Sequence, residues 1–142
     1  MRPNSALHVS IVVAILAVIP VAADEPHPGA ALYQEHCATC HGAELEGQPN
    51  WRSPNPDGTL PAPPHDESGH TWHHGDRLLF DYVKLGGAET MASRGAPGFK
   101  SAMPGFAVAL SDDDIWDILA FLKSHWSSRA RAYQEQVTAN EP

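Results

Sequence analysis

The stretch Cys37-Ala38-Thr39-Cys40-His41 largely decides how this chain folds, because it holds two thiols and an imidazole at a short, fixed spacing. Two residues between the cysteines on a helical turn set the sulfurs at the separation of the two vinyl groups of a porphyrin. Each thiol adds across one vinyl group, and His41 then lies where it can ligate the iron. The chain has 142 residues and only these 2 cysteines. The stretch therefore predicts one covalent haem c, held by Cys37 and Cys40, with His41 as an iron ligand.

Two other structures share the Cys-x-x-Cys pattern, namely an ordinary disulfide and the redox-active pair of a thioredoxin-like protein. A thioredoxin-like pair belongs at a strand-to-helix junction in a βαβ unit, and no convincing strand pattern flanks residues 37–41. Neither alternative explains the histidine that follows the second cysteine. Haem attachment is favoured, and the two alternatives stay open at this point.

The first 23 residues have the pattern of an export signal. Arg2 supplies a positive start, residues 7–19 are nearly all apolar, and small residues at 21–23 suit cleavage after Ala23. An uncleaved anchor is the alternative, but the apolar run is short for a membrane span and Pro20 interrupts it. We therefore expect residues 1–23 to be removed, with no stable membrane insertion of the mature chain.

The chain is acidic, with a formal net charge of −8 at pH 7. Nucleic acid is excluded as an expected partner, since its binding needs a basic surface. An acidic surface instead favours docking to a basic patch on another redox protein, with steering that weakens as salt rises.

The rest of the chain predicts an all-α fold with long loops. Helical patterns cover residues 29–40, 76–85 and 110–126, and Ser111 with Asp114 imitates a capping box. Residues 43–75, rich in proline, and residues 88–109 lack apolar periodicity, and a haem to wrap would explain such a long loop. We expect one domain over residues 24–126, with three to four core helices, and a helical extension or frayed tail at 127–142.

The chain resembles the class I c-type cytochromes of the bacterial single-haem kind. The resemblance is carried by residues 37–41, by Met103 within the run Ala102-Met103-Pro104-Gly105-Phe106, and by the helical pattern of residues 115–126. It implies a cytochrome c fold and maturation on the far side of the bacterial inner membrane. The periplasm is therefore the expected location, or the periplasmic face of the inner membrane if the signal is retained.

The resemblance also implies particular contacts around the haem. The first helix is expected to cross the last one, with Gly29 and Tyr33 meeting Phe121. A carbonyl from a proline-containing turn is expected to accept the free N–H of the His41 imidazole, and Pro63 or Pro64 matches that role.

Met103 is the expected distal ligand, because a soft thioether on the iron favours the ferrous state and suits an electron carrier. Met91 is the competing methionine, but no comparable motif surrounds it. Trp72 is a candidate for the haem pocket, with its ring N–H directed to a propionate. The long loop also holds four clustered histidines, which leave a bis-histidine haem or a separate metal site open: His65, His70, His73 and His74.

The sequence thus predicts a periplasmic electron-transfer protein that passes single electrons to and from redox protein partners, and not an enzyme. One alternative is a haem subunit of a redox enzyme, or a small-ligand sensor, with an open sixth position on the iron. Another is a metal-binding module that uses the loop histidines.

Overall fold

The computed structural model describes residues 27–142, so the predicted export segment at 1–23 lies outside the described residues. Within residues 27–142 the chain forms helices and no strand, which confirms the all-α prediction. The elements are α1 (Pro28–His36), α2 (Ala38–His41), a 3-10 turn η1 (Thr71–His73), α3 (Asp76–Leu85), α4 (Gly87–Ser93), α5 (Asp112–Ser124) and α6 (Ser128–Ala139). No helix in this part of the chain is long and apolar enough to span a membrane.

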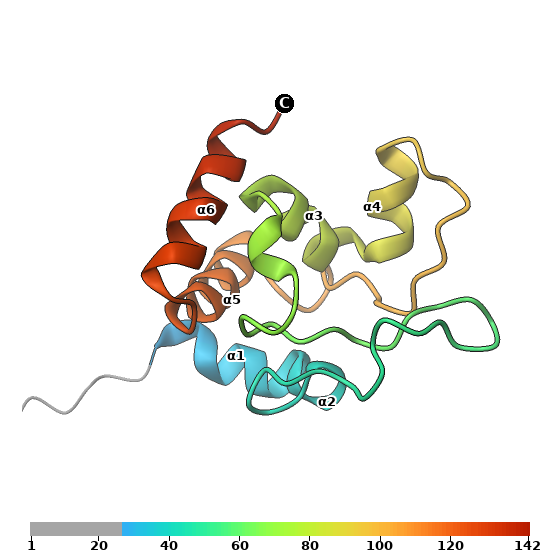
Figure 1. The fold of residues 1–142 in the computed structure, drawn as a ribbon, viewed down its shortest axis with the longest axis horizontal. Helices are drawn as coiled ribbons and strands as arrows, with labels where there is room; N and C mark the ends of the chain where they lie inside the picture. Colours follow the sequence, from blue (N-terminus) through green and yellow to red (C-terminus); the bar gives the residue numbers. More distant parts are fainter. Residues whose placement is uncertain (1–26) are drawn as a thin grey trace, which may run out of the picture.

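The helix α5 packs against both α1 and α3 (Figure 1). Gly29 lets α1 cross it at close range, because a Cβ at this position would lie 2.0 Å from the carbonyl oxygen of Asp117. One turn further on, Tyr33 is 0% exposed, and its ring centroid lies 5.4 Å from that of Phe121. The predicted crossing of the first helix over α5 is therefore present.

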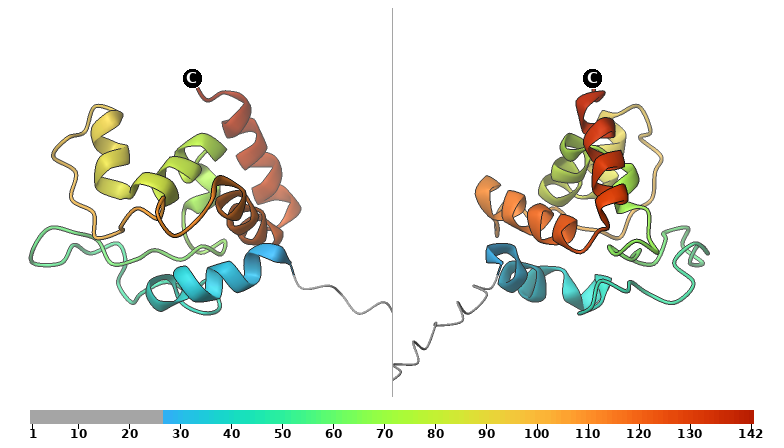
Figure 2. Two further views of the ribbon diagram at one scale, coloured as in Figure 1. Left: turned by 180° about the vertical axis from the view of Figure 1, so that it is seen from behind. Right: turned by 60° about the vertical axis from the view of Figure 1, so that its left-hand side comes forward.

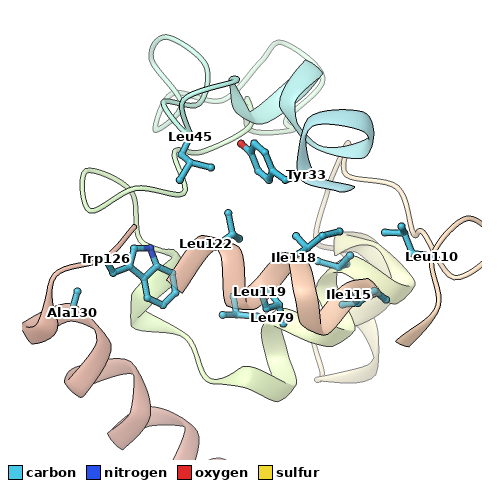
Figure 3. Packing of buried hydrophobic residues seen from close by; sticks show 11 residues of the cluster. Tyr33, Leu45, Leu79, Leu110, Ile115, Ile118, Leu119, Leu122, Trp126 and Ala130 are labelled. Atoms are coloured by element: carbon cyan, nitrogen blue, oxygen red, sulfur yellow. The ribbon is translucent and has the colours of Figure 1, made fainter. Parts of the chain in front are cut away.

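The core forms along one face of α5, as Figure 3 shows. Four buried side chains spaced along that face supply it: Ile115, Ile118, Leu119 and Leu122. They meet Leu79 and Val83 from α3, and Leu45 reaches them from the long loop. Each such side chain contributes about 1.5–3 kcal/mol when it is buried fully. The core thus joins α1, α3, α5 and the loop that follows α2.

A capping box begins α5, as the sequence predicted. The backbone N–H of Asp114 donates to the Ser111 hydroxyl at 3.2 Å, and its carboxylate accepts from the Ser111 backbone N–H at 2.9 Å. The helix ends at Ser124, two residues before the predicted end, and the chain then turns through the buried Trp126.

Residues 128–139 form a separate helix, α6, instead of a continuation of α5. The hydroxyl of Ser127 accepts from the backbone N–H of Ala130 at 3.2 Å, so a new N-terminal cap begins the second helix. Figure 2 shows α6 turned away from α5 and lying beside η1 and the start of α3.

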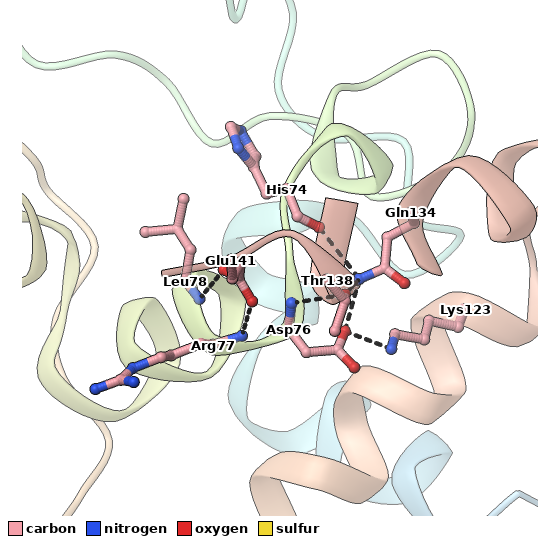
Figure 4. Close-up of polar contacts among 8 residues, drawn as sticks. All are labelled: His74, Asp76, Arg77, Leu78, Lys123, Gln134, Thr138 and Glu141. Atoms are coloured by element: carbon pink, nitrogen blue, oxygen red, sulfur yellow. Dashed lines mark hydrogen bonds and ion pairs between the residues drawn. The ribbon is translucent and has the colours of Figure 1, made fainter. Parts of the chain in front are cut away.

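A polar cluster fastens α6 to the start of α3 (Figure 4). Gln134 is 1% exposed, and its amide nitrogen lies 2.6 Å from the Asp76 carboxylate and 3.1 Å from the His74 carbonyl. The same carboxylate accepts from the Lys123 ammonium at 2.5 Å. Since buried polar groups must be paired, this cluster fixes how α5, α6 and α3 meet.

The helix α4 was not predicted, because residues 88–109 were expected to be irregular throughout. Gly86 adopts a φ of 87°, which turns the chain sharply, so a new helix begins at once where the Gly86-Gly87 pair indicated only an end. The hydroxyl of Thr90 then donates to the Asp81 carbonyl at 2.9 Å, which holds α4 against α3. Residues 94–111 are irregular, in agreement with the rest of that prediction.

Candidate haem site

Cys40 and His41 lie on α2, a single helical turn, and Cys37 is the residue between α1 and α2. The predicted helix 29–40 is broken at Cys37, which ends α1 and begins α2. Both thiols are free, with Cys37 partly buried and Cys40 exposed. Burial, together with the neighbouring Cys40, raises the pKa of Cys37 to about 11, so its thiol stays protonated at neutral pH. Residues 27–142 thus show neither the disulfide nor the βαβ unit that the two alternative structures need.

His41 has one ring nitrogen engaged and the other available. The ring is 6% exposed, and its Nδ1 lies 2.9 Å from the carbonyl oxygen of Pro63. A carbonyl only accepts, so Nδ1 carries the proton and the lone pair remains on Nε2. Burial lowers the pKa of His41, which keeps the ring neutral. A neutral imidazole with a free Nε2 is the form that ligates a metal.

Of the two prolines that the sequence left as alternatives, Pro63 supplies this carbonyl. The backbone N–H of Gly47 donates to the His41 carbonyl at 2.7 Å, and a Cβ on Gly47 would lie 2.4 Å from the nitrogen of Pro64. Glycine at 47 therefore lets the proline segment lie directly against the end of α2. The Tyr33 hydroxyl donates to the Gly42 carbonyl at 2.7 Å and ties the same turn to the core.

Met103 lies in an irregular segment that is anchored through its backbone to the start of α4. Its carbonyl accepts from the Gly87 N–H at 3.2 Å, and its own N–H donates to the Ser101 hydroxyl at 3.1 Å. The side chain is partly buried and packs against the hydrophobic core. Met91, the competing methionine, lies within α4.

A family comparison agrees with this geometry. The family model described as cytochrome c matches residues 27–126. This range runs from the first described residue to Trp126, two residues after the end of α5. The chain belongs to the cytochrome c family. No curated protein and no solved structure matches it.

The residues present fit the cofactor of this family. The cytochrome holds haem c covalently through Cys37 and Cys40, whose thiols are both free on one turn. The imidazole of His41 follows them with a neutral ring and an available Nε2. Electron transport and iron binding through the haem are therefore the general activity of the chain.

The cytochrome also brings a second imidazole against His41 that the sequence did not assign. The ring of His65 stacks on that of His41, with centroids 4.0 Å apart and planes at 22°. Burial, and then the neighbouring His41, holds the pKa of His65 well below its ordinary range, so this ring is neutral too. The sequence grouped His65 with the other loop histidines, although its place two residues after Pro63 was a signal that it lies beside the ligand.

The other loop histidines lie apart from this pair of rings. Nδ1 of His70 is 3.1 Å from Nε2 of His74, and the ring of His73 packs near Tyr133 of α6. Within residues 27–142, no group of three or more His, Cys, Asp or Glu side chains is arranged to hold a metal ion. The structure therefore gives no support to the loop metal site that the sequence left open.

Trp72 contacts α6. Its indole N–H donates to the Glu67 carbonyl at 3.4 Å, and its ring meets the ring of Tyr133 edge-on at 5.6 Å. None of these contacts tests the predicted place of Trp72 in the haem pocket, which stays a prediction. The guanidinium of Arg52 lies over the ring of Trp51, 4.1 Å from its centroid.

Proposed function

We propose that this cytochrome is a periplasmic carrier of single electrons, with His41 and Met103 as the two axial ligands of its haem iron. The observation that carries the proposal is the hydrogen bond from His41 Nδ1 to the Pro63 carbonyl. It fixes the tautomer whose Nε2 can bind iron, and it strengthens the imidazole as a donor.

When bound, haem c supplies an iron that takes up and returns one electron. The chain's own residues hold it: Cys37 and Cys40 by thioether bonds, and His41 through Nε2. The thioether of Met103 would fill the sixth position and favour the reduced state. The anchoring of Met103 through Gly87 and Ser101 supports this role, because a fixed loop keeps the sulfur in place. Filling both axial positions leaves no open site for a substrate.

The pattern of the first residues supports the proposed location. The apolar run, the small residues at 21–23 and the need to join haem to thiols outside the cytoplasm all favour export. The expected partners are redox proteins with a basic docking patch, since the chain has a formal charge of −8. The exported protein should begin at Asp24, which an N-terminal mass measured on the periplasmic fraction checks.

The ligand set is tested by visible spectra of oxidised and reduced holoprotein, with Met103→His beside Met91→Leu as the matched control. The wild type should show low-spin haem and a ferric sulfur-to-iron band. Met103→His should lose that band and lower the potential, whereas Met91→Leu should keep both. A high-spin wild type would point to an open sixth position, and loss of the band in Met91→Leu would transfer the ligand role to Met91.

A further inference from the structure

The hydrogen bond from His41 Nδ1 to the Pro63 carbonyl does not by itself fix the orientation of the His41 ring. One N–H···O contact at the ring edge leaves the imidazole free to swing about the line of that contact. A flat group that lies parallel to the ring face removes this freedom, because the rotating imidazole would collide with that group. In this structure the flat group is the imidazole of His65, with centroids 4.0 Å apart and planes at 22°.

His65 is itself held both at its backbone and at its ring. Its backbone N–H donates to the Leu45 carbonyl at 2.8 Å, and its carbonyl accepts from the Trp126 indole at 2.8 Å. Its ring Nδ1 lies 2.8 Å from the hydroxyl of Thr71, a buried residue. The ring of Tyr33 meets it edge-on at 6.3 Å. The support beneath His41 is therefore tied to α1, to the turn between α5 and α6, and to the loop.

We propose that His65 is a positioning residue, which sets the plane of the His41 imidazole and so the direction in which that ring presents its π electrons to the iron. The proposal rests on the proposed function, since it takes His41 to be an iron ligand. It goes beyond that function, because it assigns the ligand plane to a loop histidine that makes no bond to the cofactor.

The test compares four holoprotein variants with the wild type: His65→Leu, His65→Phe, Thr71→Val and, as control, His70→Leu. The plane of an axial imidazole shows in the g-values of the ferric haem and in the NMR shifts of its methyl groups. His65→Leu should keep the low-spin spectrum and the sulfur-to-iron band but change the g-values, the pattern of methyl shifts and the potential. His65→Phe retains a flat ring but lacks the bond to Thr71, so it should change the pattern much less than His65→Leu does.

Thr71→Val removes the hydroxyl that holds His65 and nearly preserves volume, so it should shift the methyl pattern in the same direction by a smaller amount. His70→Leu should leave it unchanged, because that ring contacts His74 and Trp51 instead. If His65→Leu fails to fold, His65→Phe and Thr71→Val still decide the matter. A Thr71→Val protein with wild-type methyl shifts would then overturn the proposal.

Two further outcomes overturn it while leaving the carrier function intact. One is a folded His65→Leu protein with wild-type g-values and methyl shifts. The other is a His65→Phe protein altered as much as His65→Leu, since stacking would then not be the cause. A wild type without low-spin haem overturns the proposed function as well, and the first spectrum separates that case from the other two.

Discussion

Single atoms decide most of what this site can do. The carbonyl of Pro63 selects one tautomer of His41, and the absence of a Cβ at Gly47 lets the proline segment reach it. The Cys-x-x-Cys-His motif predicted His41, and the resemblance to the family implied a proline carbonyl as its partner, but the role of Gly47 was not predicted. The sequence could not separate Pro63 from Pro64, because that depends on the path of an irregular loop and not on any local preference.

Gly29 provides the sharpest test at this scale. We expect Gly29→Ala to destabilise the holoprotein by about 1–3 kcal/mol, the usual cost of overpacking, because the new methyl group would overlap the Asp117 carbonyl. The midpoint of unfolding in guanidinium measures the change. Gly98→Ala is the matched control, since a Cβ there meets nothing within 4 Å. Equal midpoints for the two variants would show that α1 does not need its close approach to α5.

The partly buried rings of His70 and His74 predict a dependence of stability on pH. Burial first, and then neighbouring histidines, lower the pKa of each ring. The unfolded chain, with pKa values near about 6.5, therefore binds more protons in mildly acidic solution than the folded chain does. Stability should be fully present above about pH 6.5 and fall as the pH drops toward the folded pKa values.

Replacing both histidines, in a His70→Asn/His74→Asn protein, should make this loss of stability less steep. Urea unfolding at a series of pH values between about 5 and 8 measures it. The dependence should not vanish, because the pKa of His65 is lowered as well. A slope equal to that of the wild type would show that these two rings do not contribute.

At the scale of elements, α3 depends on a residue far along the chain for its cap. Gly75 precedes α3 and provides no capping side chain. The carboxylate of Glu141 accepts instead from the backbone N–H groups of Arg77 and Leu78, at 2.9 and 3.1 Å. This arrangement explains why the last residues are held in place and not frayed, and no local pattern in the sequence could have shown it.

We expect Glu141→Gln to destabilise the protein by about 1 kcal/mol, because a neutral amide accepts these N–H groups less strongly and loses the attraction to the helix dipole. Thermal unfolding followed by circular dichroism measures the change. Glu135→Gln on the exposed side of α6 removes the same charge elsewhere and should have almost no effect. A similar loss in both variants would mean that net charge, and not the cap, is responsible.

The sequence predicted those helices whose start, end and apolar face depend on residues within the helix or next to it. The apolar stripe of α5 and the Ser111 capping box are contained in the sequence around them, and both were predicted correctly. The helix α4 was missed because a pair of glycines in sequence is typical of the end of a helix. Only the φ of 87° at Gly86 shows that a second helix begins directly after it. The break between α5 and α6 depends on Trp126, whose burial needs the folded loop.

At the scale of the whole molecule, the haem adds a large apolar surface to a core that is built mainly on one face of α5. A Cys37→Ala/Cys40→Ala protein should therefore release haem in denaturant and, without it, lose helix content and unfold at lower temperature. Far-ultraviolet circular dichroism of the wild type and of this variant measures the helix content and the melting temperature. An unchanged melting temperature after haem loss would show that the helices do not need the cofactor.

The hydrogen bonds that pin the long loop have a consequence for the order of folding. Trp126 reaches the carbonyl of His65 across 61 positions of the chain, and Gln134 reaches that of His74 across 60. Contacts of such long sequence separation close slowly, after the short helical turns have formed. The turn that carries Cys37 and Cys40 is held by hydrogen bonds of short sequence separation, so we expect it to form before these long-range contacts close. That interval gives the thiols time to be joined to haem before the loop closes.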